Sequence, residues 1–463
     1  MGLSTALYTG VSGLNANGTD LSVIGNNIAN TNTVGYKGGR AAFGDILSSS
    51  MGGGSAFQIG RGVSLQSVAT QFTQGTLETT SNALDLAIEG DGFFIVKDTA
   101  GAQYYTRAGQ YKLNKDGNII NPEGLRLQGY LTQQGGVLGT INVSSLNSPP
   151  KSSANVTVSA NLNSATTVKD PTTMNNFTID STNNVVYVNG APRTLATGSY
   201  TGAALAAAFQ AVLTPLSTTA TVTYNTAGAN IYKFTINNPA GGGAAALTFD
   251  WANSATTAEH MFGYYNGGAP IVVAIGGSSN SAYRAAGFDP NNGTTTSDFS
   301  TSMTVYDSLG NSHLLNVYLK KIAENTTLIN DATKTGNRWA WWTVAPSTDS
   351  ITGQLQVGAQ GYLEFDTGGK LIADIQDYNS FNFSGGVTQG QLLAFDFGQS
   401  MTQGGSGLAG TTQFGSPNSV LFQSQDGYTS GSLQSLIVDQ NGAMTGVFSN
   451  GQTAKVADVA LAR

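Results

Sequence analysis

Apolar residues near the start of the chain recur at alternating spacings of four and three. The positions that share this spacing are Leu7, Val11, Leu14, Gly18, Leu21, Gly25 and Ile28. Such spacing predicts an amphipathic helix whose apolar stripe packs against another helix. The run NTNTVG at residues 30–35 ends it, because Asn and Gly favour turns. The residues expected to make the packing contacts between subunits are Leu7, Val11, Leu14, Leu21 and Ile28.

Glycines make this predicted helix marginal on its own. Gly10, Gly13, Gly18 and Gly25 lie within it, and each costs about 1 kcal/mol relative to Ala. An ordinary helix packed on its own domain is the alternative interpretation. The terminal position, ahead of a stretch rich in Gly and Ser, favours a helix that forms when it packs on copies of itself.

From residue 63 onward the pattern becomes that of strands. Apolar and polar positions alternate through residues 84–89, and a Gly-Asp-Gly turn then precedes the apolar run FFIV. Further strands are expected over residues 104–113 and 119–131. The sequence therefore predicts a compact all-β module that ends near residue 146.

The remainder of the chain is also rich in predicted strands. Pro149-Pro150 marks a boundary, and residues 174–265 combine strands with one Ala-rich helical stretch at 201–213. That mixture predicts an inserted α+β domain. A hairpin is expected over residues 299–322, and two final strands are joined by the turn at 439–442.

Composition narrows the class of protein. The chain has 463 residues, 60 of them Gly, and 10% are charged, which is typical of a large β-rich protein with many turns. A net charge of -7 argues against the basic face that nucleic acid requires. No apolar run approaches the roughly 20 residues of a membrane span. There is no cysteine, which excludes thiolate chemistry, and the start lacks the basic region of a secretory signal.

Few residues are candidates for catalysis or metal binding. The two histidines, His260 and His313, are far apart in sequence, and we interpret both as ordinary structural residues. The segment Asp289-Pro-Asn-Asn-Gly293 differs from a calcium loop in the position of its glycine and in lacking the closing Glu. It therefore predicts a tight turn.

A cluster of tryptophans is the strongest candidate for ligand binding. Trp339, Trp341 and Trp342 could bind a sugar or a base. More often such a run is a strand with aromatic side chains on both faces, one in the core and one under a neighbouring domain.

Several motifs together resemble those of bacterial flagellar rod and hook proteins. They are GNNIANTNT with GYK at residues 25–37, LDLAIEGDGFF at 84–94, TVYDSLGN at 304–311, GYTSGSL at 427–433, DQNG at 439–442, SNGQ at 449–452 and VALAR at 459–463. The motifs occur in the family's order along nearly the whole chain. The large middle region, from Pro149 to about Met401, favours the hook over the rod, because rod relatives usually lack it.

The resemblance implies a structural protein without catalysis, cofactor or metal. Such subunits self-assemble into the hook, a flexible tube that transmits torque from the motor and rod to the filament. The implied location is the flagellar basal body and hook, outside the cell, after type III export without a cleaved signal peptide. The implied partners are further copies, the rod, hook cap and hook–filament junction proteins and the type III export apparatus, with no nucleic acid and no membrane insertion.

The implied fold is mainly β and multidomain. It comprises an N-terminal amphipathic helix, a β-rich axial domain, and a β-barrel or sandwich-like outer domain with an inserted α+β domain. The expected boundaries are 1–37 for the axial helix and turn, 38–62 for a Gly/Ser-rich linker, 63–146 plus 402–463 for the middle β domain, 147–170 plus 288–401 for the outer β domain, and 171–287 for the inserted outermost domain.

One departure from the family pattern affects assembly. Hook proteins normally continue past the Ala-Leu-Ala-Arg segment into a C-terminal helix, whereas this sequence ends at Arg463. We therefore expect poor assembly of this form, and disorder over its first roughly 30 residues in the monomer, because a short unpacked helix is marginal.

Other functions remain open on the sequence. Another axial protein, of the distal rod or the hook–filament junction, is one alternative. A surface adhesin or glycan-binding protein that uses the Trp339 cluster and the inserted domain is another. A hydrolase is a distant third, given the two histidines.

Overall fold

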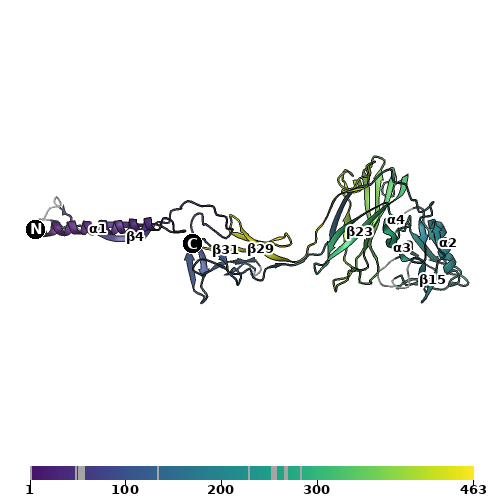
Figure 1. Cartoon of the computed structure of the whole chain (residues 1–463), viewed down its shortest axis with the longest axis horizontal. Helices are drawn as coiled ribbons and strands as arrows, with labels where there is room; N and C mark the ends of the chain where they lie inside the picture. The colour runs from purple at the N-terminus through teal and green to yellow at the C-terminus, as the bar shows by residue number, and fades with distance from the viewer. Residues whose placement is uncertain are drawn as a thin grey trace. The chain divides into compact units, whose positions relative to one another are not determined.

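The computed structural model describes residues 3–46, 49–50, 58–132, 135–227, 230–251, 258–264, 270–281 and 284–463. The chain divides into two compact units (Figure 1): the first is Met1–Ser148 with Gly431–Arg463, and the second is Pro149–Ser430. Strands dominate both units, and one long helix opens the first. The mainly β, multidomain fold with an N-terminal helix is therefore confirmed.

The first unit begins with a helix beside a hairpin. Helix α1 spans Leu3–Ala29, and strand β1 (Gly39–Asp45) pairs antiparallel with β4 (Val63–Thr70), from Gly39 opposite Thr70 to Asp45 opposite Val63. Two shorter strands, β2 (Ser49–Ser50) and β3 (Gln58–Ile59), pair with each other. The expected linker at 38–62 is wrong over β1, because that segment finds its partner in β4.

A larger sheet forms the rest of the first unit. Its strands run in the order β11-β29-β30-β31-β9-β5-β32, with β6, β7, β8 and β10 alongside. Their bounds are β5 Phe93–Lys97, β6 Gln103–Thr106, β7 Lys112–Leu113, β8 Ile119–Ile120, β9 Arg126–Leu131, β10 Val137–Thr140, β11 Asn147–Ser148, β29 Gly431–Val438, β30 Ala443–Phe448, β31 Thr453–Val459 and β32 Leu461–Ala462. The final strands complete the sheet, because β31 pairs with β9 and β32 pairs with β5.

The second unit contains two facing sheets, which we call the main β domain. One is the antiparallel series β22 (Phe299–Tyr306), β23 (Ser312–Thr327), β24 (Thr335–Ala345), β25 (Gln356–Asp366) and β26 (Leu371–Asn379). The other is β27 (Ala394–Asp396), β12 (Asn155–Asn161) and β28 (Ser419–Gln425). The predicted boundary at residue 402 is wrong, because β28 pairs with β12 and belongs to this unit.

Side chains replace a backbone ladder where the two sheets meet at β26 and β27. Gln376 Nε2 donates to the Leu393 carbonyl oxygen at 2.9 Å, and the Phe395 amide donates to Gln376 Oε1 at 3.2 Å. The Phe397 amide donates to Asp374 Oδ2 at 2.9 Å. These bonds satisfy backbone groups that would otherwise be left at a sheet edge.

The inserted region, residues 171–287, packs on the outer face of the first sheet. Its elements are β13 Phe177–Ile179, β14 Val185–Val188, β15 Ala191–Thr194, β16 Gly198–Tyr200, α2 Gly202–Leu213, β17 Thr221–Tyr224, β18 Phe234–Asn238, β19 Leu247–Phe249, α3 Glu259–Phe262, β20 Ile271–Val273 and β21 Gly277–Asn280. The short helices η2 (Pro290–Asn292) and α4 (Gly293–Thr296) follow it, and η3 (Met401–Gln403) comes later in the unit. Thr201 begins α2, because its hydroxyl accepts a hydrogen bond from the Ala204 amide at 3.1 Å. The core of this region includes Trp342 and Val344 from β24.

Candidate subunit interface

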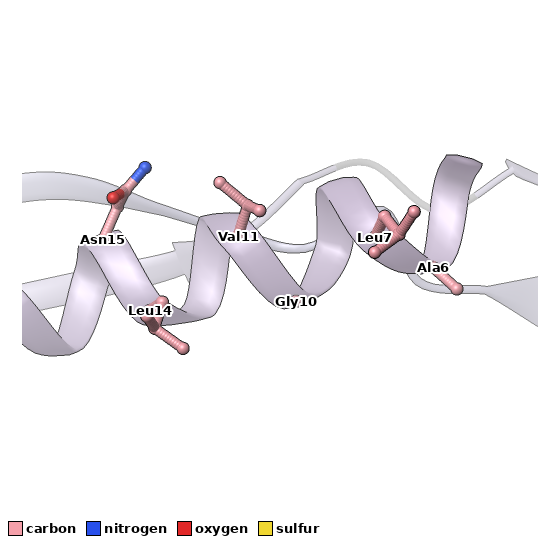
Figure 2. A pocket seen from close by; sticks show the side chains of 6 residues that line it. All are labelled: Ala6, Leu7, Gly10, Val11, Leu14 and Asn15. Atoms are coloured by element: carbon pink, nitrogen blue, oxygen red, sulfur yellow. The ribbon is translucent and has the colours of Figure 1, made fainter. Parts of the chain in front are cut away.

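The five residues predicted for subunit packing all lie on the exposed side of α1. Their exposed fractions run from 55% for Val11 to 79% for Leu14, with Leu7, Leu21 and Ile28 between these values. Figure 2 shows Leu7, Val11 and Leu14 projecting from the helix around Gly10. Together the five form an apolar stripe, the α1 stripe, that the described part of the chain leaves open.

The opposite side of α1 carries mostly small or polar residues, and it packs on the hairpin. Its half-buried positions include Ser12, Ala16, Val23 and Asn27. The Ser12 hydroxyl accepts a hydrogen bond from the Val63 amide at 3.3 Å. The expectation of disorder over this segment is contradicted, because Leu3–Ala29 is helical and β1 and β4 support its polar side.

The Asn-rich motif holds the chain where α1 turns into β1. Asn27 Nδ2 donates to the Gly39 carbonyl oxygen at 2.8 Å, and Asn27 Oδ1 accepts from the Gly39 amide at 2.9 Å. The Tyr36 hydroxyl donates to Asn27 Oδ1 at 3.0 Å and accepts from Asn26 Nδ2 at 3.1 Å. Sequence reasoning identified this motif only by resemblance and did not assign it this role. The signal was present, because an Asn side chain carries both a donor and an acceptor and can hydrogen-bond to the backbone of a neighbouring segment.

The hairpin and the segment after it extend the open apolar surface. Phe43, Leu65 and Val68 on β1 and β4 are exposed, as are Phe72 and Leu77 beyond them. An isolated two-stranded hairpin is marginal in water. The helix and hairpin therefore present a surface that suits burial against other chains.

The helix glycines have no role in packing within the described part of the chain. A Cβ added at Gly10, Gly13, Gly18 or Gly25 would meet nothing described within 4 Å. The glycines therefore leave room on α1 for another backbone to approach closely. Gly18 and Gly25 lie within the heptad-like spacing of the α1 stripe.

The tryptophan cluster is buried and does not form a binding surface. Trp339 and Trp341 lie in the core between the facing sheets, at 0% exposure. Trp342 points to the other side of β24 and stacks on Phe288, with ring centroids 4.6 Å apart. The interpretation of a strand with aromatics on both faces agrees with this arrangement.

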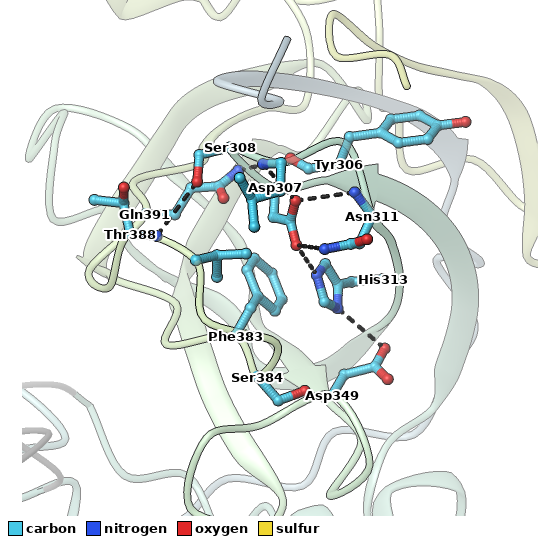
Figure 3. A network of polar contacts seen from close by, with 12 residues as sticks. Tyr306, Asp307, Ser308, Asn311, His313, Asp349, Phe383, Ser384, Thr388 and Gln391 are labelled. Atoms are coloured by element: carbon cyan, nitrogen blue, oxygen red, sulfur yellow. Dashed lines mark hydrogen bonds and ion pairs between the residues drawn. The ribbon is translucent and has the colours of Figure 1, made fainter. Parts of the chain in front are cut away.

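His313 belongs to a buried polar network at one end of the main β domain (Figure 3). Its Nε2 lies 2.8 Å from Asp307 Oδ2, its Nδ1 lies 3.6 Å from Asp349 Oδ2, and its ring stacks on Phe383. Burial raises the pKa of Asp307, but hydrogen bonds from His313 and Asn311 outweigh it and lower that pKa. The network holds the turn at 307–311. His260 lies in α3, and its side chain is outside the described residues.

The remaining candidates for chemistry are structural. Asp289 begins η2, with its Oδ1 accepting from the Asn291 amide at 3.0 Å, as expected for a tight turn. The described residues contain no cluster of three His, Asp or Glu side chains that could hold a metal ion. Within the described part of the chain, every helix is too short or too polar to span a bilayer.

Three family models match successive parts of the chain. A flagella basal body rod protein model matches residues 7–37, a flagellar hook protein FlgE/F/G D1 domain model matches 87–187, and a flagellar basal body protein FlaE D2 domain model matches 277–428. The terminal helix and the β module that begins at β5 therefore match models of flagellar axial proteins. The chain is a member of the flagellar rod and hook family.

Within this family, the relatives include several hook proteins. The chain is 38% identical over 180 residues to flagellar hook protein FlgE of Salmonella typhimurium, covering 37% of this chain and 43% of that protein. It is 41% identical over 139 residues to FlgE of Borreliella burgdorferi, covering 28% of this chain and 31% of that protein. It is also 40% identical over 143 residues to flagellar basal-body rod protein FlgG of Bacillus subtilis, covering 29% of this chain and 53% of that protein. The chain thus spans less than half the length of the two hook proteins. The crystal structure of Helicobacter pylori flagellar hook protein FlgE2 aligns with 83% of the chain, at a TM-score of 0.39 and 16% identity.

Proposed function

We propose that this chain is a structural subunit that self-assembles into the flagellar hook, the flexible tube that transmits torque from the motor and rod to the filament. The observation that carries the proposal is the α1 stripe, which is exposed while the polar side of α1 packs inward. The names of the hook relatives support it.

Burial of the stripe provides a driving force for assembly. Fully burying a side chain such as Leu or Val contributes about 1.5–3 kcal/mol, and five such residues line the stripe. The rest of the surface is sparsely charged, since only 10% of residues are charged. Contacts between copies would then be mostly apolar and polar, without many locked ion pairs, which suits a tube that bends as it turns.

The wider setting of this function is proposed with it. The partners are further copies, the rod, hook cap and hook–filament junction proteins and the type III export apparatus, and the location is the flagellum outside the cell. The role is structural and not enzymatic. The match to a rod protein keeps a distal-rod subunit as the second candidate.

Sedimentation and negative-stain electron microscopy at rising concentration test the proposal. The double variant Leu14→Asp/Leu21→Asp places charge on the stripe and should abolish association. The control Leu309→Asp places charge on another exposed leucine, in the second unit, and should associate like the wild type.

The outcomes separate the candidates. Curved tubes or their short precursors, lost only in the stripe variant, support the hook. Straight tubes would favour the rod. Equal association of the stripe variant and the wild type would contradict the proposal.

A further inference from the structure

The inserted region and the five-stranded sheet β22–β26 lie in the same compact unit, and the sheet face between them is apolar in one part and polar in another. Trp342 of β24 belongs to the apolar core of the inserted region. Arg338 lies on the same face of β24, because side chains alternate along a strand, and it is 1% exposed. Apolar burial is non-directional. Any preference for one orientation must therefore come from the polar part.

One buried ion pair joins the inserted region to the sheet. Arg284 Nη1 donates to Asp377 Oδ1 on β26, and the two side chains are 8% and 10% exposed. The Arg284 guanidinium also lies over the Tyr362 ring, 4.3 Å from its centroid. The Arg284 carbonyl oxygen accepts from Gln360 Nε2 at 3.3 Å. Three side chains of β25 and β26 therefore contact a single residue of the inserted region.

A buried cation of the sheet binds the backbone of the same segment. Lys320 Nζ on β23 donates to the carbonyl oxygens of Ala286 and Gly287 at 2.9 Å each. The Lys320 side chain is among the largest fully buried ones in the described part of the chain. A shifted inserted region would take these two acceptors away from the ammonium group, and a buried charge without partners is strongly unfavourable.

A tyrosine in an uncommon backbone conformation makes the third contact. Tyr232 of the inserted region has a φ of +63°, which bulky residues rarely adopt. Its hydroxyl accepts from Arg338 Nη1 at 3.3 Å, and the Arg338 guanidinium lies 5.8 Å from the centre of its ring. Glu364 Oε1 holds Arg338 by accepting from its Nε at 3.1 Å and its Nη2 at 2.8 Å. Backbone strain of this kind persists only where the surrounding contacts outweigh it.

We propose that the contacts of Arg284, Lys320 and Tyr232, which we call the polar contact set, hold the inserted region in one orientation on the sheet. The apolar core between the two parts supplies most of the stability, because apolar burial is non-directional. The polar contact set supplies the specificity, because its buried cations find their partners in this one arrangement. This role belongs to the single chain and does not depend on assembly.

Replacing the ion pair separates stability from orientation. Asp377→Ala takes the carboxylate from a buried guanidinium, so urea unfolding should show the folding equilibrium constant lowered by at least about 100-fold. Arg284→Met/Asp377→Leu removes both charges and keeps apolar side chains in their place. This double variant should recover the equilibrium constant to within about tenfold of the wild type.

Spin labels measure the orientation itself. The chain has no cysteine, so Ala207→Cys on α2 and Ser302→Cys on β22 introduce two exposed sites, one in the inserted region and one in the main β domain. The distribution of distances between the labels should be wider in Arg284→Met/Asp377→Leu than in the wild type. A pair that only stabilised the fold would leave this width unchanged once stability had recovered.

The control is Lys334→Met, which removes an ion pair within the main β domain, where Lys334 Nζ lies 3.2 Å from Asp331 Oδ2. It should leave the stability and the distance distribution close to those of the wild type. If the double variant does not fold, Lys320→Met gives the same comparison, because it removes a different member of the polar contact set and should also widen the distribution. A folded variant of the set with the wild-type distribution would overturn the proposal.

Discussion

At several positions another backbone segment approaches so closely that only glycine fits. At Gly129 on β9, an added Cβ would lie 2.6 Å from the Asp458 carbonyl oxygen on β31. At Gly109 it would lie 1.6 Å from the Leu86 carbonyl oxygen. Both contacts join segments that are distant in the sequence. These glycines therefore reflect the tertiary structure, and no local pattern distinguishes them from the many turn glycines.

Lys320 is a buried cation with a measurable pH dependence. Its Nζ donates to the carbonyl oxygens of Ala286 and Gly287 at 2.9 Å each. Burial, helped by repulsion from Lys169 and opposed by attraction to Asp298, lowers the pKa of Lys320 to about 7. The unfolded pKa is about 10.4. Between these two values the unfolded chain binds more protons, so the stability of the second unit should rise with pH.

Urea unfolding at several pH values between about 7 and 10 checks this prediction. Lys320→Met should remove the part of the slope that comes from this group. Lys370→Met, at an exposed position, should leave the slope as in the wild type. A slope equal to that of the wild type in Lys320→Met would show that Lys320 does not carry the effect.

At the scale of elements, α1 is unusual because its apolar side is exposed and its more polar side packs on the protein. The apolar side is open, and the side that contacts β1 and β4 carries Ser12, Ala16 and Asn27. Helix propensity alone does not stabilise so Gly-rich a segment, and most helical stability in proteins comes from packing of the apolar face. Burial of the stripe against a partner should therefore add to the stability of α1.

Replacing the two glycines of the α1 stripe should strengthen the helix but weaken association between copies. Gly18→Ala/Gly25→Ala should stabilise α1 by about 1 kcal/mol per site, because the added methyl groups meet nothing described within 4 Å. The same methyl groups should weaken association by holding a partner backbone away. Circular dichroism and sedimentation measure the two effects.

Gly13→Ala is the matched control for this pair. Gly13 also has free space, but it lies on the half-buried side of α1. It should stabilise the helix without weakening association. Unchanged association in the stripe pair would mean that no partner backbone approaches Gly18 and Gly25.

At the scale of the whole molecule, the core of the inserted region extends into the main β domain. The core of the inserted region contains Ile322, Trp342, Val344 and Val357 from the main β domain. Neither part can bury these side chains alone. We therefore expect the second unit to unfold in one transition, although the sequence predicted a separate inserted domain.

Trp342→Ala tests this shared core. Loss of a buried aromatic typically costs about 3–5 kcal/mol, and here both parts should lose that stability together. Urea unfolding followed by circular dichroism, with hydrogen exchange in β18 and in β25, measures the two parts. Leu309→Ala, at an exposed site, should change the stability little. Two separate transitions would contradict the shared core.

The sequence alone determined the local elements of this protein. The spacing of the α1 stripe, the Ala-rich helix α2 and the turn at 307–311 follow from contacts between residues a few positions apart. Such contacts obey the helical and strand periods, so the pattern of side chains is enough to predict them. The motifs of the flagellar rod and hook family are likewise short and local.

Only the tertiary structure decided which distant segments pair. The partner of β1 is β4, β28 joins β12, and the three tryptophans of β24 divide between two cores. A strand pattern shows which face is buried but carries little information on the partner, because any segment with a compatible face can supply the backbone hydrogen bonds. The direction of the α1 stripe was decided in the same way, when the hairpin took the polar side of the helix.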